Sequence, residues 1–188
     1  MFNFFSKSKN RSLQIDAVLL FDNRYLVTSG ERPIRSGDLV DIELPDGIEN
    51  PSPGTQVRFQ IQKDTLSKTV PVQAIAIKME IISENPKSLY LNINNGVKIL
   101  DLMKDNAYLI DVRGGDEYAS GHIPGALLLP VAQIDQIADI VTDKTGVIML
   151  YCGSGSRSAA AASQLRKMGY RIVTQLDGLI SYRGKLIR

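Results

Sequence analysis

The chain has 188 residues, of which 44% are hydrophobic and 22% are charged, and its formal net charge is +2. So small a charge, carried by scattered Lys and Arg residues, argues against a nucleic-acid partner. One cysteine excludes an intramolecular disulfide, and no apolar stretch approaches the roughly 20 residues of a membrane-spanning helix. We therefore expect a globular protein of one or two domains in the cytoplasm, where a lone thiol stays reduced.

The segment Met1–Lys7 contains three phenylalanines but neither a long apolar core nor a small-residue cleavage site. It is not typical of a signal peptide. We expect a frayed terminus. The alternative is a short tail that touches a membrane or docks on a partner.

Residues 13 to 84 have the pattern of short β-strands without a convincing helix. Several segments alternate apolar and polar residues, and Gly, Pro, Asn and Asp separate them. This rhythm predicts a small antiparallel barrel or sandwich. The expected strands are Leu13–Phe21, Tyr25–Thr28, Leu39–Leu44, Gln56–Ile61 and Val70–Ile82.

From about residue 86 strands alternate with helices, which predicts an α/β domain with a mainly parallel sheet and helices on both faces. We place the boundary in Ser83–Pro86, giving an all-β domain over residues 1–85 and an α/β domain over 86–188. The expected strands are Leu89–Ile93, Tyr108–Val112, Ala126–Leu129, Val147–Tyr151 and Arg171–Gln175. The expected helices are one capped by Asn95 and ending near Lys104, then Val131–Ile140, and Ser158–Met168 closed by Gly169.

The only cysteine, Cys152, lies between an apolar strand and a helix N-terminus, where main-chain N–H groups and the helix dipole lower a thiol pKa. Gly153 and Gly155 allow the loop to curl into an anion-binding nest. Arg157 adds a fixed cation. The alternative is a buried cysteine that acts as a small hydrophobic residue.

Four motifs in order resemble the rhodanese-like domain family over about residues 86–188. They are Leu109–Arg113 with Glu117-Tyr118, Gly121–Ala126, the C-x-x-G-x-R loop Cys152–Arg157, and Gly169-Tyr170 with Leu176–Gly178. The resemblance implies a sulfurtransferase. A Cys152 persulfide would take sulfur from a small donor such as thiosulfate or a persulfide and pass it to cyanide or a thiol. No metal and no organic cofactor are expected.

In this resemblance Cys152 is the nucleophile, and the loop Gly153-Ser154-Gly155-Ser156-Arg157 holds first the thiolate and then the persulfide. Whether the two serines donate hydroxyl groups to substrate or only suit a tight loop stays open. Related phosphatases have a loop one residue longer, which suits a tetrahedral phosphate. The six-residue loop here, with no acidic residue, favours sulfur transfer.

Three further residues are expected to support the site structurally, namely Asp111, Arg113 and His122. Asp111 and Arg113 end a strand near the loop, and Arg113 has the spacing of a local ion pair with Glu117. His122 lies in the turn with which the family shapes the site. The alternative for His122 is a catalytic Cys–His pair.

A second functional reading is a regulatory or sensory module. In it the β-rich half binds a ligand or a protein partner, and Cys152 reports persulfide or oxidant. Residues 36–54 are distantly similar to barrels of the PilZ type, but Arg32–Arg35 copies their arginine-rich motif poorly. We expect an interaction barrel without a ligand.

Overall fold

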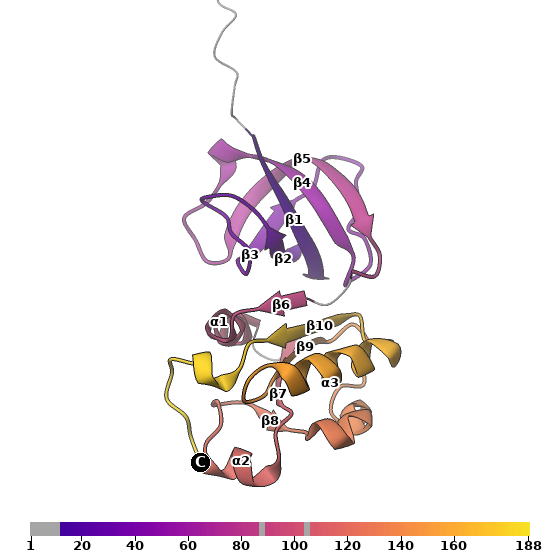
Figure 1. The fold of residues 1–188 in the computed structure, drawn as a ribbon. Coiled ribbons are helices and arrows are strands. Elements are labelled where there is room, and N and C mark those ends of the chain that lie inside the picture. The colour runs from indigo at the N-terminus through magenta and orange to yellow at the C-terminus, as the bar shows by residue number, and fades with distance from the viewer. Residues whose placement is uncertain (1–11, 87–88, 104–105) are drawn as a thin grey trace, which may run out of the picture. The chain divides into compact units, whose positions relative to one another are not determined.

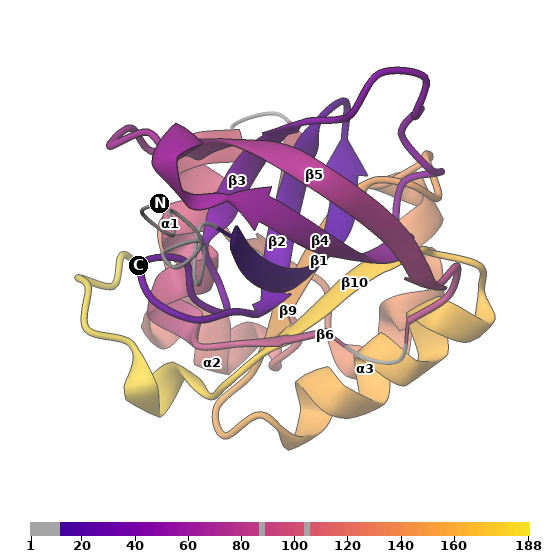
Figure 2. The ribbon, with the colours of Figure 1, turned by 90° about the horizontal axis from the view of Figure 1, so that it is seen from above.

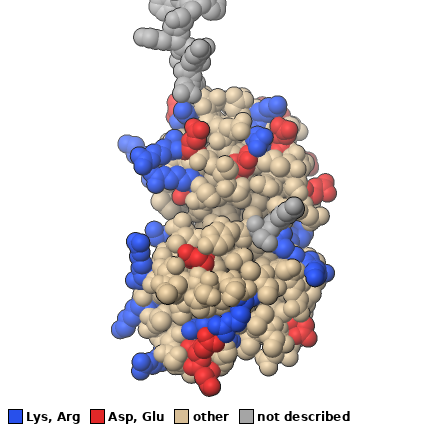
Figure 3. All heavy atoms as spheres, viewed as in Figure 1, with Lys and Arg blue, Asp and Glu red and all other residues tan. Residues whose placement is uncertain are grey.

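The computed structural model (Figure 1) describes residues 12–86, 89–103 and 106–188. The chain forms two compact units, Met1–Glu84 and Asn85–Arg188. The tail Met1–Lys7, for which we expect fraying or docking, lies outside the described residues. Within the described ranges, no helix has both the length and the apolar character needed to cross a bilayer. On the face drawn in Figure 3 both units carry acidic as well as basic side chains.

The first unit is a closed barrel with the strand order β1-β2-β3-β5-β4 (Figure 2). Its strands are β1 (Ser12–Phe21), β2 (Arg24–Ser29), β3 (Leu39–Glu43), β4 (Gln56–Gln62) and β5 (Val72–Ser83), with a 3-10 turn at Lys63–Thr65. The expectation of a purely antiparallel sheet is wrong, because β3 pairs with β5 in parallel. A closed ring with an odd number of strands cannot alternate direction throughout, so one pair must be parallel.

The barrel interior is apolar because each strand turns alternate residues inward. In β4 the residues Val57, Phe59 and Ile61 are buried and their neighbours Arg58 and Gln60 are exposed. The Phe59 ring meets Tyr25 edge to face, with ring centroids 4.9 Å apart. The alternation seen in the sequence therefore builds a continuous core.

The second unit contains a parallel sheet with the order β6-β10-β9-β7-β8. The strands are β6 (Leu89–Leu91), β7 (Ala107–Asp111), β8 (Leu127–Leu128), β9 (Val147–Tyr151) and β10 (Ile172–Leu176). All five residues of the central strand β9 are buried, as expected for a strand covered on both faces.

Helices pack on both faces of this sheet. On one face α3 (Ser156–Lys167) and the 3-10 segment Val131–Asp139 form a core with residues of β7, β9 and β10. On the other, α1 (Ile93–Met103) approaches so closely that a Cβ on Gly96 would lie 2.7 Å from the Leu176 side chain. The remaining short elements are α2 (Gly115–Ser120) and a 3-10 turn, Leu179–Ser181.

Several element boundaries differ from the sequence-based prediction. The Asp177 carboxylate accepts the main-chain N–H of Ile93 at 2.5 Å, so α1 begins at Ile93 and Asn95 lies inside it rather than capping it. This contact with a residue far along the chain also ends β6 earlier than expected. The short helix α2 was not predicted. Lys104, where we expected the helix now labelled α1 to end, lies outside the described residues.

Candidate functional site

The Cys152 thiol lies directly after β9 and is buried. The main-chain N–H of Gly155 donates to its Sγ at 3.1 Å, and the Ser158 hydroxyl lies 3.9 Å from it. Gly155 has a φ of 98°, a conformation that favours glycine, and it turns the chain into α3. The structure therefore brings a helix N-terminus onto the sulfur, as the sequence predicts.

The pKa of Cys152 reflects two opposing effects. Burial raises it, but hydrogen bonds from the main-chain N–H groups of Ser158, Ser154 and Gly155, together with the Ser158 hydroxyl, lower it further than burial raises it. The net pKa lies below the ordinary value of a thiol. The loop therefore favours the thiolate, the nucleophilic form of cysteine.

Arg157, at the end of the loop, makes a two-point ion pair with Glu117 of α2. Its two terminal nitrogens donate to the Glu117 oxygens at 2.6 and 2.9 Å. This pairing, with the N–H of Gly114, lowers the pKa of Glu117 to about 2. Glu117 also raises the pKa of Arg157, and the Cys152 side chain adds to that increase. Glu117 is thus ionised at neutral pH and has no proton to give as a general acid.

The predicted pair between Arg113 and Glu117 is wrong. Arg113 instead binds Asp111, with Nη2 2.6 Å from Oδ2, and donates to the Gly121 carbonyl at 2.8 Å. The reason is α2, which places Glu117 toward Arg157 and leaves Asp111 as the buried partner. Arg113 therefore links the end of β7 to the turn after α2.

The His122 side chain packs on α2 rather than on the Cys152 thiol. Its ring stacks on Tyr118 with centroids 3.6 Å apart, and its Nδ1 lies 3.1 Å from the Tyr118 carbonyl oxygen. Its main chain exchanges two hydrogen bonds with Ile187, each 2.9 Å long. Both His122 and Cys152 are described, and no hydrogen bond joins them. This arrangement gives no support to a Cys–His pair and fits the expected role in shaping the turn.

The segment after β10 closes over the cysteine loop. The main-chain N–H of Leu179 donates to the Cys152 carbonyl at 2.8 Å. A Cβ on Gly178 would lie 2.3 Å from the Gly153 carbonyl oxygen, so only glycine allows this approach. The Leu176–Gly178 motif was visible in the sequence, but its contact with the loop was not.

Two loop residues and one helix residue complete the surroundings. Ser154 and Ser156 are exposed, with hydroxyl oxygens 3.5 Å apart. The Ser158 hydroxyl, which sequence reasoning did not single out, donates to the Gly155 carbonyl at 2.9 Å. The one sequence feature that could have indicated Ser158 is its position directly after the loop. The structure thus gathers the predicted loop, Glu117 and Ser158 around one buried sulfur.

This geometry defines an α/β domain in which a six-residue loop surrounds one buried cysteine thiol. A family model described as the Rhodanese-like domain matches residues 95–181. Over 71 residues the chain is 37% identical to thiosulfate sulfurtransferase PspE of Escherichia coli, covering 37% of this chain and 68% of that protein. The chain therefore belongs to the rhodanese-like domain family.

Two other proteins and one solved structure are similar to parts of this chain. A sulfurtransferase of Allochromatium vinosum is 35% identical over 80 residues, 42% of this chain and 73% of that protein. A tRNA uridine(34) hydroxylase of Wigglesworthia glossinidia brevipalpis is 28% identical over 141 residues, 68% of this chain but only 45% of that protein. A solved structure titled rhodanese with anions, from E. coli, aligns over 44% of this chain and 98% of that one, with 31% identity and a TM-score of 0.42.

Proposed function

We propose that this protein is a sulfurtransferase that carries sulfane sulfur as a persulfide on Cys152. The observation that supports this most is the Gly155 N–H, 3.1 Å from a buried Sγ whose pKa is lowered. A thiolate held by fixed main-chain donors is a ready nucleophile, because the donors need not reorganise as charge moves.

In the first step the Cys152 thiolate attacks the outer sulfur of a donor such as thiosulfate. A bond forms between Sγ and that sulfur, the sulfur–sulfur bond of thiosulfate breaks, and sulfite leaves with the electron pair. The negative charge then lies on the outer sulfur of the persulfide. The N–H groups of the loop from Gly153 to Arg157 are the donors we assign to that charge. Arg157 would attract the anionic donor, with Glu117 moderating its charge.

In the second step a thiophilic acceptor, cyanide or a thiol, attacks the outer sulfur and releases the Cys152 thiolate. The burial of Cys152 favours a sulfur donor over a phosphate ester, because a single terminal sulfur atom is slimmer than a phosphoryl group. The ionised Glu117 argues in the same direction, since a phosphatase needs an acid to protonate its leaving group.

The test is mass spectrometry of the intact chain after incubation with thiosulfate. We expect the wild type to gain one sulfur atom and to lose it on addition of cyanide. Cys152→Ser should gain none. Ser is isosteric enough to keep the loop, and a urea melt of both proteins checks that they are equally folded. A wild-type protein that gains no sulfur would overturn the proposal.

A sensory module is the second candidate function. An HTH-type transcriptional regulator from Mycobacterium tuberculosis is 37% identical to this chain over 78 residues. The two candidates predict different kinetics. An enzyme turns over many equivalents of thiosulfate with a thiol acceptor, whereas a sensor accepts one sulfur atom and holds it. Counting sulfite released per chain distinguishes them.

A further inference from the structure

One edge of β5 has no strand beside it after Ile75. In the barrel β3 pairs with β5 over Val72–Ile75 only, whereas β4 pairs with it over Ala76–Ser83. Apart from the ladder with β4, no main-chain hydrogen bond among the described residues involves Ala76–Ile82. Alternate N–H and C=O groups of this stretch are therefore available to another strand, as on any sheet edge.

The same stretch carries exposed apolar side chains. Ile77 and Ile81 are 51% and 52% exposed, and Ile75 and Ile82 are exposed as well. Single apolar residues on a surface are ordinary, but several of them on an unpaired strand edge favour association with another polypeptide. The edge thus offers both main-chain hydrogen-bonding groups and apolar surface.

A row of charged residues crosses the barrel and ends at this edge. Asp16 of β1 lies opposite Arg58 of β4, and Arg58 lies opposite Glu80 of β5. Asp16 binds Arg58, with Nε 2.7 Å from Oδ1. Asp16 raises the pKa of Arg58, and the charge of Glu80 adds to that increase. The signs alternate and the row ends on an acidic residue, so a neighbouring strand would best present a cation opposite Glu80.

Lys78 supplies that cation when the neighbouring strand is β5 of a second copy. Two antiparallel β5 strands with Met79 opposite Met79 place Lys78 of each copy directly opposite Glu80 of the other. Neither Lys78 nor Glu80 belongs to an ion pair among the described residues. The same register places Ile77 opposite Ile81. The edge is therefore complementary to itself, as a twofold interface requires.

Two β-bulges limit the registers that are open to this edge. The pairing of β4 with β5 shifts between Gln56 and Val57 and again between Gln60 and Ile61. Bulges bend and twist a strand, which confines further pairing to the residues around Met79. Lysines and bulges are also means by which proteins keep free edges apart. The chain then stays monomeric, so its state of association distinguishes the two roles.

We propose that two copies of this chain associate through β5 and form one continuous sheet across two barrels, around a twofold axis at Met79. Main-chain hydrogen bonds join the two edges, two ion pairs between Lys78 and Glu80 fix the register, and Ile77 and Ile81 of both copies are covered. The interface does not use Cys152, and it stands whether or not the chain transfers sulfur.

Sedimentation velocity of the full chain over a range of concentrations tests this interface. We expect the wild type to sediment as a dimer that dissociates on dilution. Lys78→Glu or Glu80→Lys alone places like charges opposite one another twice, so each should raise the dissociation constant of the dimer at least about tenfold. The double variant restores opposite charges. It should recover most of the affinity, because Glu80→Lys also places a cation beside Arg58.

Mixing the two single variants gives the sharpest comparison. In a mixed pair the acidic side chains of one copy lie opposite the basic side chains of the other, so the mixture should dimerise where each variant alone does not. Because misfolded chains would not recover on mixing, this result also shows that both variants are folded.

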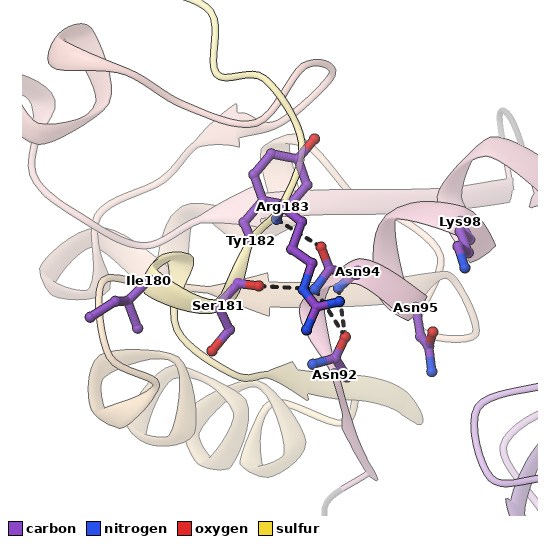
Figure 4. Close-up of a pocket in the computed structure, with 8 residues that line it drawn as sticks. All are labelled: Asn92, Asn94, Asn95, Lys98, Ile180, Ser181, Tyr182 and Arg183. Atoms are coloured by element: carbon purple, nitrogen blue, oxygen red, sulfur yellow. Dashed lines mark hydrogen bonds between the residues drawn. The ribbon is translucent and has the colours of Figure 1, made fainter.

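Lys98→Glu is the matched control, since it makes the same charge reversal in the second unit, where Figure 4 shows Lys98 at a polar pocket. It should dimerise as the wild type does. The proposal is overturned by a wild type that is monomeric at every concentration, by a dimer that the single reversals leave intact, or by a mixture that stays monomeric. A dimer that Lys98→Glu weakens equally would also contradict it.

Discussion

The two compact units use their charged residues in opposite ways. In the barrel, Arg24 pairs with Asp41 across neighbouring strands, with Nε 2.8 Å from Oδ1, outside an apolar core. In the second unit, Arg157 pairs with Glu117 next to the buried thiol of Cys152. Ion pairs between strands contribute modestly to stability, whereas charged side chains beside a buried titratable group are typical of functional sites. This difference places the candidate functional site in the second unit.

The largest effect is expected at Gly178. A methyl group there would lie 2.3 Å from the Gly153 carbonyl oxygen, so Gly178→Ala must displace the cysteine loop. We expect the rate of sulfur loading to fall at least about a hundredfold, because misplaced reacting groups lose rate steeply. Time-resolved mass spectrometry after thiosulfate addition measures it.

Gly115→Ala is the matched control for that variant, because a Cβ at Gly115 meets no atom within 4 Å. It should load at the wild-type rate. If Gly178→Ala also loads normally while remaining folded, the contact between the two segments does not position the loop.

A smaller effect is expected at the ion pair. Arg157→Gln removes the cation that faces the thiolate and the incoming anion, and we expect the efficiency of loading by thiosulfate to fall roughly tenfold or more. Glu117→Gln should act in the other direction by freeing Arg157. Quenched loading reactions of each variant at low and high salt measure the electrostatic contribution to donor capture, because salt screens that contribution. Equal loading by all three proteins would show that the pair has no part in donor capture.

The smallest effect on loading is expected in the barrel. Ile61 is fully buried there, and Ile61→Val should cost about 0.5–1.5 kcal/mol of unfolding free energy while leaving the loading rate unchanged. Urea denaturation and the loading assay on the same sample measure both. A change in loading comparable to that of the Arg157 variant would mean that the units are coupled, and would weaken the contrast between them.

Local patterns predicted most of the fold because they report local physics. The alternation in β4 and the apolar run of β9 gave strands close to the observed ranges. The missed features depend on partners distant in sequence. Asp177 sets the start of α1 from 84 residues away, and the parallel pairing of β3 with β5 follows from closure of the ring.

In the candidate site, too, local features were predicted and contacts between residues distant in sequence were missed. The local pattern predicted the loop from Cys152 to Arg157 as the candidate site, because a strand, a turn with glycines and a helix follow one another there. Glu117 was assigned the wrong partner, since its true partner Arg157 is 40 residues away and only the fold of α2 brings them together. Gly178 stood in a visible motif, but its close approach to the loop is a property of tertiary structure.

Hydrogen bonds from main-chain N–H groups lower the pKa of Cys152 despite its burial, and the proposed nucleophile depends on this shift. Its most direct test is the thiolate absorbance of the folded chain as a function of pH, corrected with Cys152→Ser. Because the chain has one cysteine, the signal belongs to one site. We predict a midpoint below the ordinary value of a thiol, near 8.5 in model peptides. A midpoint at or above that value would show that burial outweighs the hydrogen bonds to the sulfur.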